Sequence, residues 1–300
     1  MENHFIKGEY DAIIIGAGHA GCEASLALAR TGFKTALLTL NLDAIAFMAC
    51  NPSIGGTAKG HLVREIDALG GEMGYSADLV TLQSRTLNLG KGAAVYSKRI
   101  QADRMMYRAI MKATLENTEN LRVIQAEVTD IKTVSENGQK RIDSVVPRLG
   151  EEYKCKCAIL CTGTFLNGTV HTGDICYLSG PDSLMAATYL TNALVREGIS
   201  MMRFKTGTPA RVHKDSIDFS RLEIQEGDGD IIPFSFETEE KAENKVSCYL
   251  TYTNTKTHDI IKENKNVIHF HKGFVVVVDG EFGKSDGIFQ FCAKFVVIGD

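Results

Sequence analysis

Short apolar runs alternate with helically spaced apolar residues along this chain, which predicts a mixed α/β protein. Tyr10–Ile15 is apolar, rich in isoleucine and followed by glycine, so it predicts a buried strand. Gly18–Arg30 is rich in Ala and Leu and predicts a helix that ends at Thr31-Gly32. Lys34–Thr39 predicts a second strand. Strand, turn, helix and strand within about 30 residues constitute one right-handed βαβ unit.

Further along the chain, helical and extended patterns continue to alternate. Leu42–Thr57 has neither periodicity and predicts a loop. Asp215–Asn244 is polar and acidic, which indicates a loop or an insertion. From Asn266 the pattern changes to short apolar runs between glycine-rich turns. The other expected helices are Lys59–Leu69, Leu79–Leu87, Ala102–Glu116 and Leu184–Glu197, and the other expected strands are Leu121–Asp130, Arg141–Val146, Glu152–Cys157, Ala158–Cys161 and Val246–Thr253.

The composition is that of an ordinary globular protein. Of the 300 residues 44% are apolar and 23% are charged, so the chain can bury a substantial core. The longest apolar runs, such as Ala12–Ile15 and Phe274–Val278, are far shorter than the roughly 20 residues that span a bilayer. Met1–Tyr10 is polar and contains no apolar signal-peptide segment. We therefore expect no membrane association and a cytoplasmic location.

Cysteine spacing and net charge exclude some chemistry. The eight cysteines are scattered without a CxxC pair, so we expect reduced thiols, no metal site and no disulfide framework. The net charge of −4 gives no global electrostatic reason to bind nucleic acid. Local basic residues such as Arg99, Arg104 and Arg108 usually form a solvated surface.

The residues Gly16-Ala17-Gly18-His19-Ala20-Gly21 match the dinucleotide fingerprint GxGxxG, between an expected strand and an expected helix as the motif requires. Gly16 permits the tight turn, Gly18 lets the backbone approach a diphosphate, and Gly21 lets the helix pack on the strand. The free amides at the helix N-terminus then face the phosphates. The alternative is a glycine turn with a packing role alone.

The choice between FAD and NAD depends on weaker features. Both cofactors often meet an acidic residue at the end of the second strand, but here that strand ends Leu37-Leu38-Thr39. Asp43 lies about 20 residues after Gly21, beyond the strand. Ala158–Gly163 is similar to the later strand and Thr-Gly turn of flavoproteins that bind two dinucleotides. The combination of the fingerprint near the N-terminus with this later strand and turn favours FAD.

Eight short blocks occur together and in order, and as a set they are far more specific than the fingerprint. They are Gly16–Glu23 (GAGHAGCE), Cys50–Gly56 (CNPSIGG), Lys59–Gly71 (KGHLVREIDALGG), Gln101–Arg104 (QADR), Gly163–Gly168 (GTFLNG), Lys205–Pro209 (KTGTP), Ser216–Ser220 (SIDFS) and Tyr252–His258 (YTNTKTH). From about residue 8 to about residue 264 the chain resembles the MnmG family, also called GidA, of tRNA uridine 5-carboxymethylaminomethyl modification enzymes.

The resemblance implies an FAD enzyme that works with the GTPase MnmE, as a heterotetramer built on an MnmG homodimer. This pair modifies carbon 5 of the wobble uridine of certain tRNAs, using a methylene-tetrahydrofolate carbon, an amine donor and NADH. The family's FAD-contacting positions correspond to Gly16–Gly21 and to Val128. Cys50 matches a family cysteine of proposed importance and is our candidate catalytic residue.

Each candidate side chain also has a purely structural interpretation. A Cys50 thiolate would be favoured by Lys59 and His61 if they approach it, whereas the alternative is a buried cysteine that packs under the flavin. We expect His19 to position the glycine turn rather than to act as an acid or base. Lys205 would meet a phosphate or a substrate carbonyl, or cap its own loop.

The same ambiguity applies to the basic residues in the expected helix Ala102–Glu116 and just before it. Arg99, Arg104 and Arg108 fit contacts to tRNA phosphates, and they fit a solvated helix face equally well.

The chain departs from the family after Asn264. A glycine- and proline-rich segment that contacts NAD, a closing FAD segment and a C-terminal helical domain are not seen, so we expect the NADH site to be missing. We expect a Rossmann-like FAD domain with a doubly wound parallel sheet at 1–204, the start of an inserted NAD-type α/β domain at 205–265, and an atypical β-rich ending at 266–300. On this basis the chain would hold FAD weakly or not at all and would be inactive alone.

Three other functions remain open from the sequence. One is the folate-dependent tRNA uridine methyltransferase, which is also an FAD protein; the CNPSIGG and KGHLVREIDALGG blocks favour MnmG over it. Another is a non-catalytic fragment that binds a nucleotide or a partner. A small-molecule flavin oxidoreductase is disfavoured because the shared blocks extend well beyond the dinucleotide turn.

Overall fold

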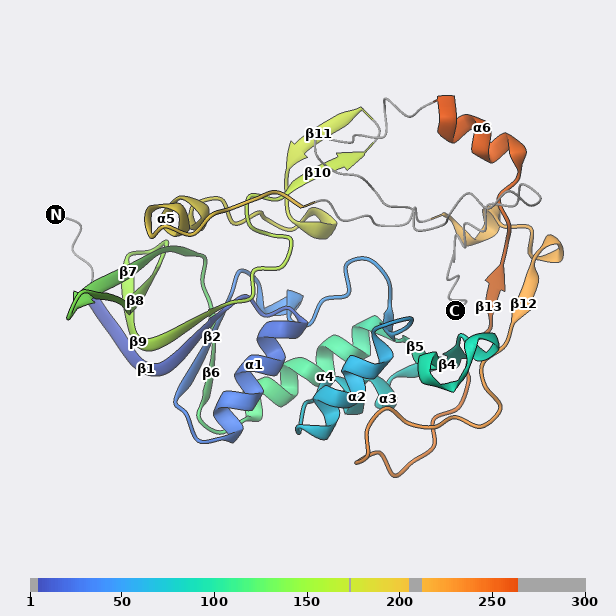
Figure 1. Ribbon diagram of the computed structural model, residues 1–300, viewed down its shortest axis with the longest axis horizontal. Coiled ribbons are helices and arrows are strands. Elements are labelled where there is room, and N and C mark those ends of the chain that lie inside the picture. The colour runs from blue at the N-terminus through green and yellow to red at the C-terminus, as the bar shows by residue number, and fades with distance from the viewer. Residues whose placement is uncertain (1–4, 173, 205–211, 264–300) are drawn as a thin grey trace.

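The computed structural model describes residues 5–172, 174–204 and 212–263 (Figure 1). Helices and strands alternate through the first half of the chain, as expected for an α/β protein. The helices are α1 (His19–Arg30), α2 (Gly60–Ala68), α3 (Met73–Leu79), α4 (Arg104–Asn117), α5 (Leu190–Arg196) and α6 (Thr255–Glu263). The strands are β1 (Phe5–Ile15), β2 (Thr35–Thr39), β3 (Ser53–Gly55), β4 (Thr81–Leu87), β5 (Ser97–Ala102), β6 (Leu121–Gln125), β7 (Val128–Glu136), β8 (Gln139–Pro147), β9 (Glu151–Leu160), β10 (Thr169–Thr172), β11 (Ile175–Leu178), β12 (Glu223–Gln225) and β13 (Cys248–Leu250).

The central sheet has six strands in the order β6-β2-β1-β9-β8-β7. The first four are parallel, while β8 pairs antiparallel with both β9 and β7. In the predicted βαβ unit, Ile13 pairs with Ala36 across β1 and β2, and α1 connects the two strands. The Rossmann-like parallel sheet expected from the sequence is therefore confirmed, with an antiparallel edge.

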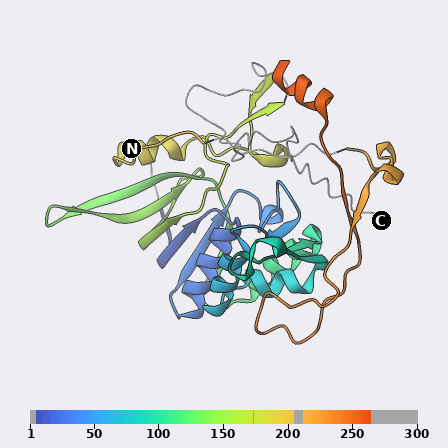
Figure 2. The same cartoon turned by 45° about the vertical axis from the view of Figure 1, so that its right-hand side comes forward.

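Two hydrophobic cores lie on opposite faces of the sheet because successive side chains of a strand point in opposite directions. Ala12 and Ile14 share one core with buried residues of α1 and α4. Ile13 and Ile15 share the other core with β7, β8, β9 and α5. Figure 2 shows α5 on the opposite side of the sheet from α1.

A second sheet, β3-β5-β4, corrects two expectations. The segment Leu79–Leu87, expected to be helical, forms strand β4, and the expected loop Leu42–Thr57 contains β3. The buried face of β4 is polar, and Gln83 Nε2 donates to the carbonyl of Gln225 at 2.7 Å. A strand whose buried residues are polar lacks the apolar alternation that identifies strands, which is why the sequence pattern failed here.

Three further element predictions are wrong in part. The expected strand Leu121–Asp130 is two strands, β6 and β7, which occupy opposite edges of the central sheet. The expected helix Leu184–Glu197 begins only at Leu190, because Ala187 pairs instead with the backbone of Phe165, its amide donating at 3.0 Å. The expected strand Ala158–Cys161 is the end of β9, and it is partly exposed rather than buried.

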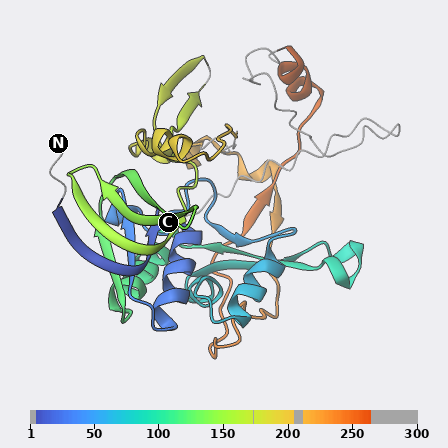
Figure 3. The same ribbon diagram turned by 60° about the vertical axis from the view of Figure 1, so that its left-hand side comes forward.

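The acidic segment Asp215–Asn244 is mostly loop, as predicted, and contains the short strand β12 and two short 3-10 helices, Lys214–Ser216 and Phe219–Arg221. It is anchored to the second sheet. Asp228 accepts from the amide of Thr86 at 2.7 Å, and Asn244 accepts from the amide of Ser84 at 2.8 Å. Figure 3 shows the β10–β11 hairpin standing apart from the central sheet, beyond α5.

Some predictions fall outside the described residues, namely those for the Lys205–Pro209 block with Lys205 and for the ending at 266–300. Within the ranges that the structure describes, no helix is both long and apolar enough to cross a bilayer. In those same ranges no cluster of three or more His, Cys, Asp or Glu side chains is placed to hold a metal ion.

Candidate cofactor site

The glycine loop Gly16–Gly21 connects β1 to α1 at the carboxyl end of the parallel strands. Gly16 donates its amide to the carbonyl of Leu38 in β2 at 2.8 Å. The amide of Cys161, just after β9, donates to the carbonyl of Ile15 at 2.8 Å. The loop is therefore held between three strand ends, which is where open α/β sheets bind their ligands.

Two of the three fingerprint glycines are required by the fold itself. Gly16 has a φ of 104°, and a Cβ added there would lie 2.3 Å from the carbonyl oxygen of Cys161. A Cβ on Gly21 would lie 1.8 Å from the carbonyl oxygen of Gly16. Neither position has room for a side chain, because contacts of this length lie deep inside van der Waals distance.

Gly18 is different, since nothing in the described protein requires a glycine there. Its φ is −71°, a value that any residue adopts, and an added Cβ would meet no protein atom within 4 Å. The space in front of Gly18 is open. At this position of the dinucleotide fingerprint, a glycine that the fold does not need fits a group from outside that approaches the backbone closely.

The N-terminus of α1 provides the matching electrostatics. Gly18 is its N-cap, and among the described residues no side chain accepts a hydrogen bond from the first-turn amides. The first turn of the helix contains no acidic residue. Uncapped amides and the positive end of the helix dipole favour an anion. The loop fits the diphosphate of a dinucleotide.

Segment 45–50 runs alongside the glycine loop and carries Cys50. The amide of Ala46 donates to the carbonyl of Ala17 at 2.9 Å, and Met48 is buried in the same core as Ala17. Cys50 itself is partly exposed, two residues after Met48. Lys59 and His61, at the start of α2, are both exposed. The backbone therefore brings the segment that bears Cys50 to the loop.

Helix α4 supplies a polar wall that sequence reasoning largely missed. Tyr107 is fully buried, and its ring centroid lies 5.7 Å from that of His19. Arg108 lies over the ring of Phe47, with its guanidinium carbon 5.4 Å from the centroid. The sequence singled out Arg104 and Arg108 but gave no signal for Tyr107.

Four buried polar atoms, one on the glycine loop and three on α4, have no hydrogen-bond partner within the described chain. They are His19 Nδ1, Arg104 Nη1, Tyr107 Oη and Arg108 Nε. Burial lowers the pKa of His19 below its ordinary value, so the imidazole is neutral near pH 7.

Val128 is at the start of β7 and is buried in the second core, on the face of the sheet away from α1. Two residues earlier, the amide of Ala126 donates to the carbonyl of Thr39 at 2.8 Å. The start of β7 therefore lies beside the end of β2, where the ribose of a dinucleotide is expected.

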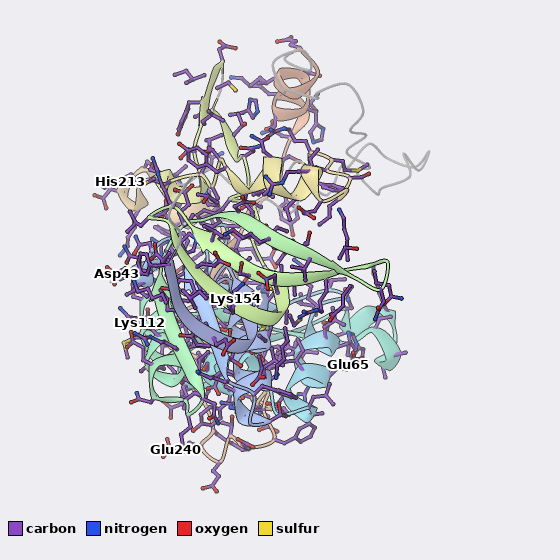
Figure 4. All side chains as sticks on the ribbon, turned by 90° about the vertical axis from the view of Figure 1, so that its left-hand side faces the viewer. Asp43, Glu65, Lys112, Lys154, His213 and Glu240 are labelled. Carbon is purple, nitrogen blue, oxygen red and sulfur yellow. The ribbon has the colours of Figure 1, made fainter. Side chains whose placement is uncertain are left out.

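Asp43, the acidic residue that follows β2 in the sequence, pairs with a lysine. Asp43 is exposed and forms an ion pair with Lys112 of α4 at 3.4 Å, on the flank of the molecule shown in Figure 4. A cavity of about 360 Å³ also adjoins Glu127, and the sequence gave no sign of it. It is lined in part by Arg148, which pairs with Glu127 at 3.1 Å and lies over the ring of Tyr189.

Comparison with known proteins gives one consistent answer. The family model described as "Glucose inhibited division protein A" matches residues 11–281. The tRNA uridine 5-carboxymethylaminomethyl modification enzyme MnmG of Caldicellulosiruptor saccharolyticus is 51% identical over 292 residues, covering 97% of this chain and 46% of its own length. MnmG of Clostridium botulinum (strain Okra / Type B1) is 53% identical over 292 residues, with the same coverage. The crystal structure of Aquifex aeolicus GidA (form I) superposes with a TM-score of 0.81 at 47% identity, covering 86% of this chain and 44% of that one.

These matches extend further along the chain than the sequence motifs do. An alignment that covers 97% of 300 residues reaches past residue 264, where the recognisable blocks stop. The chain spans about half the length of the curated relatives it matches. The family model and both relatives agree with the motif-based resemblance, and this chain belongs to the glucose inhibited division protein A (GidA, MnmG) family.

Proposed function

We propose that this chain is the FAD-binding part of an MnmG-type enzyme that modifies uridine in tRNA. The observation that carries the proposal is Gly18, a glycine in front of open space at an uncapped helix N-terminus. Relatives at 51% and 53% identity bear the name of the tRNA uridine modification enzyme, which supports the substrate class.

Each part of the site has a separate task in this proposal. The amides of Gly18, His19 and Ala20 bind the cofactor diphosphate, and Gly16 and Gly21 hold the loop in shape for it. FAD, when bound, supplies the redox chemistry, while the protein orients it. Val128 lines the adenosine end, and Cys50 is the candidate catalytic thiol beside the loop.

The wider assembly is part of the same proposal and depends on the family alone. We infer that the substrate is tRNA, that the partner is the GTPase MnmE in a heterotetramer built on an MnmG homodimer, and that NADH is the reductant. A cytoplasmic location belongs with these inferences.

One observation weighs against the methyltransferase alternative. Relatives that bear the MnmG name match at 51% and 53% identity over 97% of the chain, which favours this reaction over folate-dependent uridine methylation. A non-catalytic fragment would bind the nucleotide at the same site but would catalyse no reaction. A binding experiment therefore tests the part of the proposal on which the rest depends.

The test compares two glycine-to-alanine variants. Gly18→Ala adds a methyl group that the folded protein accommodates but a bound diphosphate does not, and Gly90→Ala is the matched control because Gly90 also has no protein atom near an added Cβ. Binding of FAD is followed by flavin fluorescence and binding of ADP by calorimetry. ADP is included because it carries the diphosphate without needing any contact to the flavin ring.

We expect saturable binding of ADP to the parent chain and to Gly90→Ala, and only weak binding of FAD, as the sequence predicts. Gly18→Ala should bind at least about tenfold more weakly, because a methyl group forced into a packed contact costs about 1–3 kcal/mol. Its melting temperature should match that of the parent. Binding of neither FAD nor ADP by the parent, or equal affinity of Gly18→Ala and Gly90→Ala, would contradict the proposal.

A further inference from the structure

Arg104 and Arg108 on α4 carry buried nitrogens that the described protein leaves without an acceptor. Arg104 Nη1 and Arg108 Nε are both inaccessible to water and make no hydrogen bond. No carboxylate of the described residues forms a salt bridge with either guanidinium. Buried charges in proteins are paired, because an unpaired one loses its hydration without compensation. Each arginine side chain is only partly buried, and Arg108 Nη1 donates to the sulfur of Met105 at 3.7 Å, but the two buried nitrogens have no acceptor. The matching acceptor for a guanidinium is an anion.

The position of the two arginines indicates where that anion lies. They are four residues apart on α4, so they share one face of the helix. Tyr107, between them, packs against His19 of the glycine loop. Arg108 lies over Phe47, whose neighbour Ala46 is hydrogen bonded to Ala17. The arginine face therefore adjoins the glycine loop.

The nearby acidic side chains are committed to other partners. Asp103 caps α4 itself, accepting from the amides of Met105 and Met106. Asp43 pairs with Lys112, and Glu23 accepts from the amides of Glu72 and Met73. The missing anion is not one of these carboxylates.

We propose that Arg104 and Arg108 bind the dinucleotide diphosphate from α4, across from the amides of α1, so that the phosphates are clamped between two helices. This inference rests on the proposed function, because it assigns new residues to the same ligand. A guanidinium is suited to the task, since its planar fork binds phosphate oxygens in pairs. The contact also gives the buried nitrogens the acceptors that they lack.

The experiment compares Arg104→Gln and Arg108→Gln with the control Arg122→Gln, which alters an exposed arginine of β6. ADP binding is measured by calorimetry at several salt concentrations, and adenosine binding by saturation-transfer NMR. Arg104→Lys is added because it keeps the charge but loses the fork. Circular dichroism and melting temperature establish that each variant is folded.

Each glutamine variant should weaken ADP binding by about tenfold or more and leave adenosine binding within about twofold of the parent. The salt dependence of ADP binding should become shallower in both, and Arg104→Lys should lie between Arg104→Gln and the parent. The control should match the parent throughout.

The outcomes separate the two proposals. If the parent binds ADP and both glutamine variants bind it as tightly as Arg122→Gln does, the clamp is refuted and the glycine-loop site stands. If ADP and adenosine are weakened equally, the arginines do not contact phosphate and the clamp is again refuted. If the parent binds no ADP at all, the proposed function fails and the clamp fails with it.

Discussion

Two buried polar regions lie next to each other in this protein, and they satisfy their hydrogen bonds in opposite ways. Around α3, every buried carboxylate is saturated by the chain itself. Glu72 accepts from Arg30 at 2.6 Å and from Ser76 at 3.0 Å. Asp78 accepts from the amides of Phe234 at 2.9 Å and Ser235 at 2.8 Å. This region joins distant segments and completes the fold.

At the glycine loop the situation is reversed. His19, Arg104, Tyr107 and Arg108 each bury a polar atom that has no partner within the described chain. The difference teaches a way of distinguishing the two roles. Buried polar groups whose hydrogen-bond partners lie within the chain stabilise the fold. Buried polar groups without such partners, next to an anion-binding helix end, indicate a ligand.

The largest effect on stability should follow from removing a buried carboxylate that accepts several hydrogen bonds from the chain. Asp78→Ala leaves two buried amides and the Thr238 hydroxyl, which donates to Asp78 at 2.8 Å, without an acceptor. We expect a loss of about 3–5 kcal/mol in the free energy of unfolding, measured by urea denaturation. Asp43→Ala, at an exposed carboxylate, is the control and should stay within about 0.5 kcal/mol. A small effect of Asp78→Ala would break the comparison.

A smaller effect, dependent on pH, is expected at Glu152 of β9, whose carboxylate accepts hydrogen bonds from side chains of β7 and β8. Hydrogen bonds from Lys132 at 2.6 Å and Ser144 at 2.7 Å lower the pKa of Glu152 from 4.5 to about 2. Because the folded pKa is the lower one, the stabilisation is complete above pH 4.5 and is lost as the pH falls toward 2.

Glu152→Gln tests this linkage. The parent should be more stable than the variant at about pH 6, and about 1–2 kcal/mol of that advantage should disappear by about pH 2 in denaturant titrations. An advantage that does not change over this range would mean that Glu152 is not held ionised by its neighbours.

The smallest effect on stability should follow from removing a buried polar group that has no hydrogen-bond partner within the described protein. Tyr107→Phe deletes a buried hydroxyl that has no partner within the described protein, so the free energy of unfolding should stay the same or rise by up to about 1 kcal/mol. Thermal denaturation without ligand checks this. A loss comparable to that of Asp78→Ala would show that the hydroxyl is part of the fold and would erase the contrast between the two regions.

The sequence predicted the βαβ unit to within a few residues, because an isoleucine-rich run, three spaced glycines and an Ala-rich helix are all local signals. It missed β4, whose buried Gln83 is satisfied by Gln225, 142 residues away. The site was likewise predictable only where its signal is local in the sequence. The fingerprint was readable, but the open face of α4 exists only because the fold sets Tyr107 against His19.

The central claim is that the backbone at Gly18 receives a diphosphate, and its most direct test is the amide signals of the glycines. Protein labelled with ¹⁵N only at its 28 glycines would be titrated with ADP. We predict that the signals of Gly16, Gly18 and Gly21 move most, while those of Gly90 and Gly138 stay in place. Saturable binding that leaves these three signals unmoved and shifts glycines elsewhere would contradict the account.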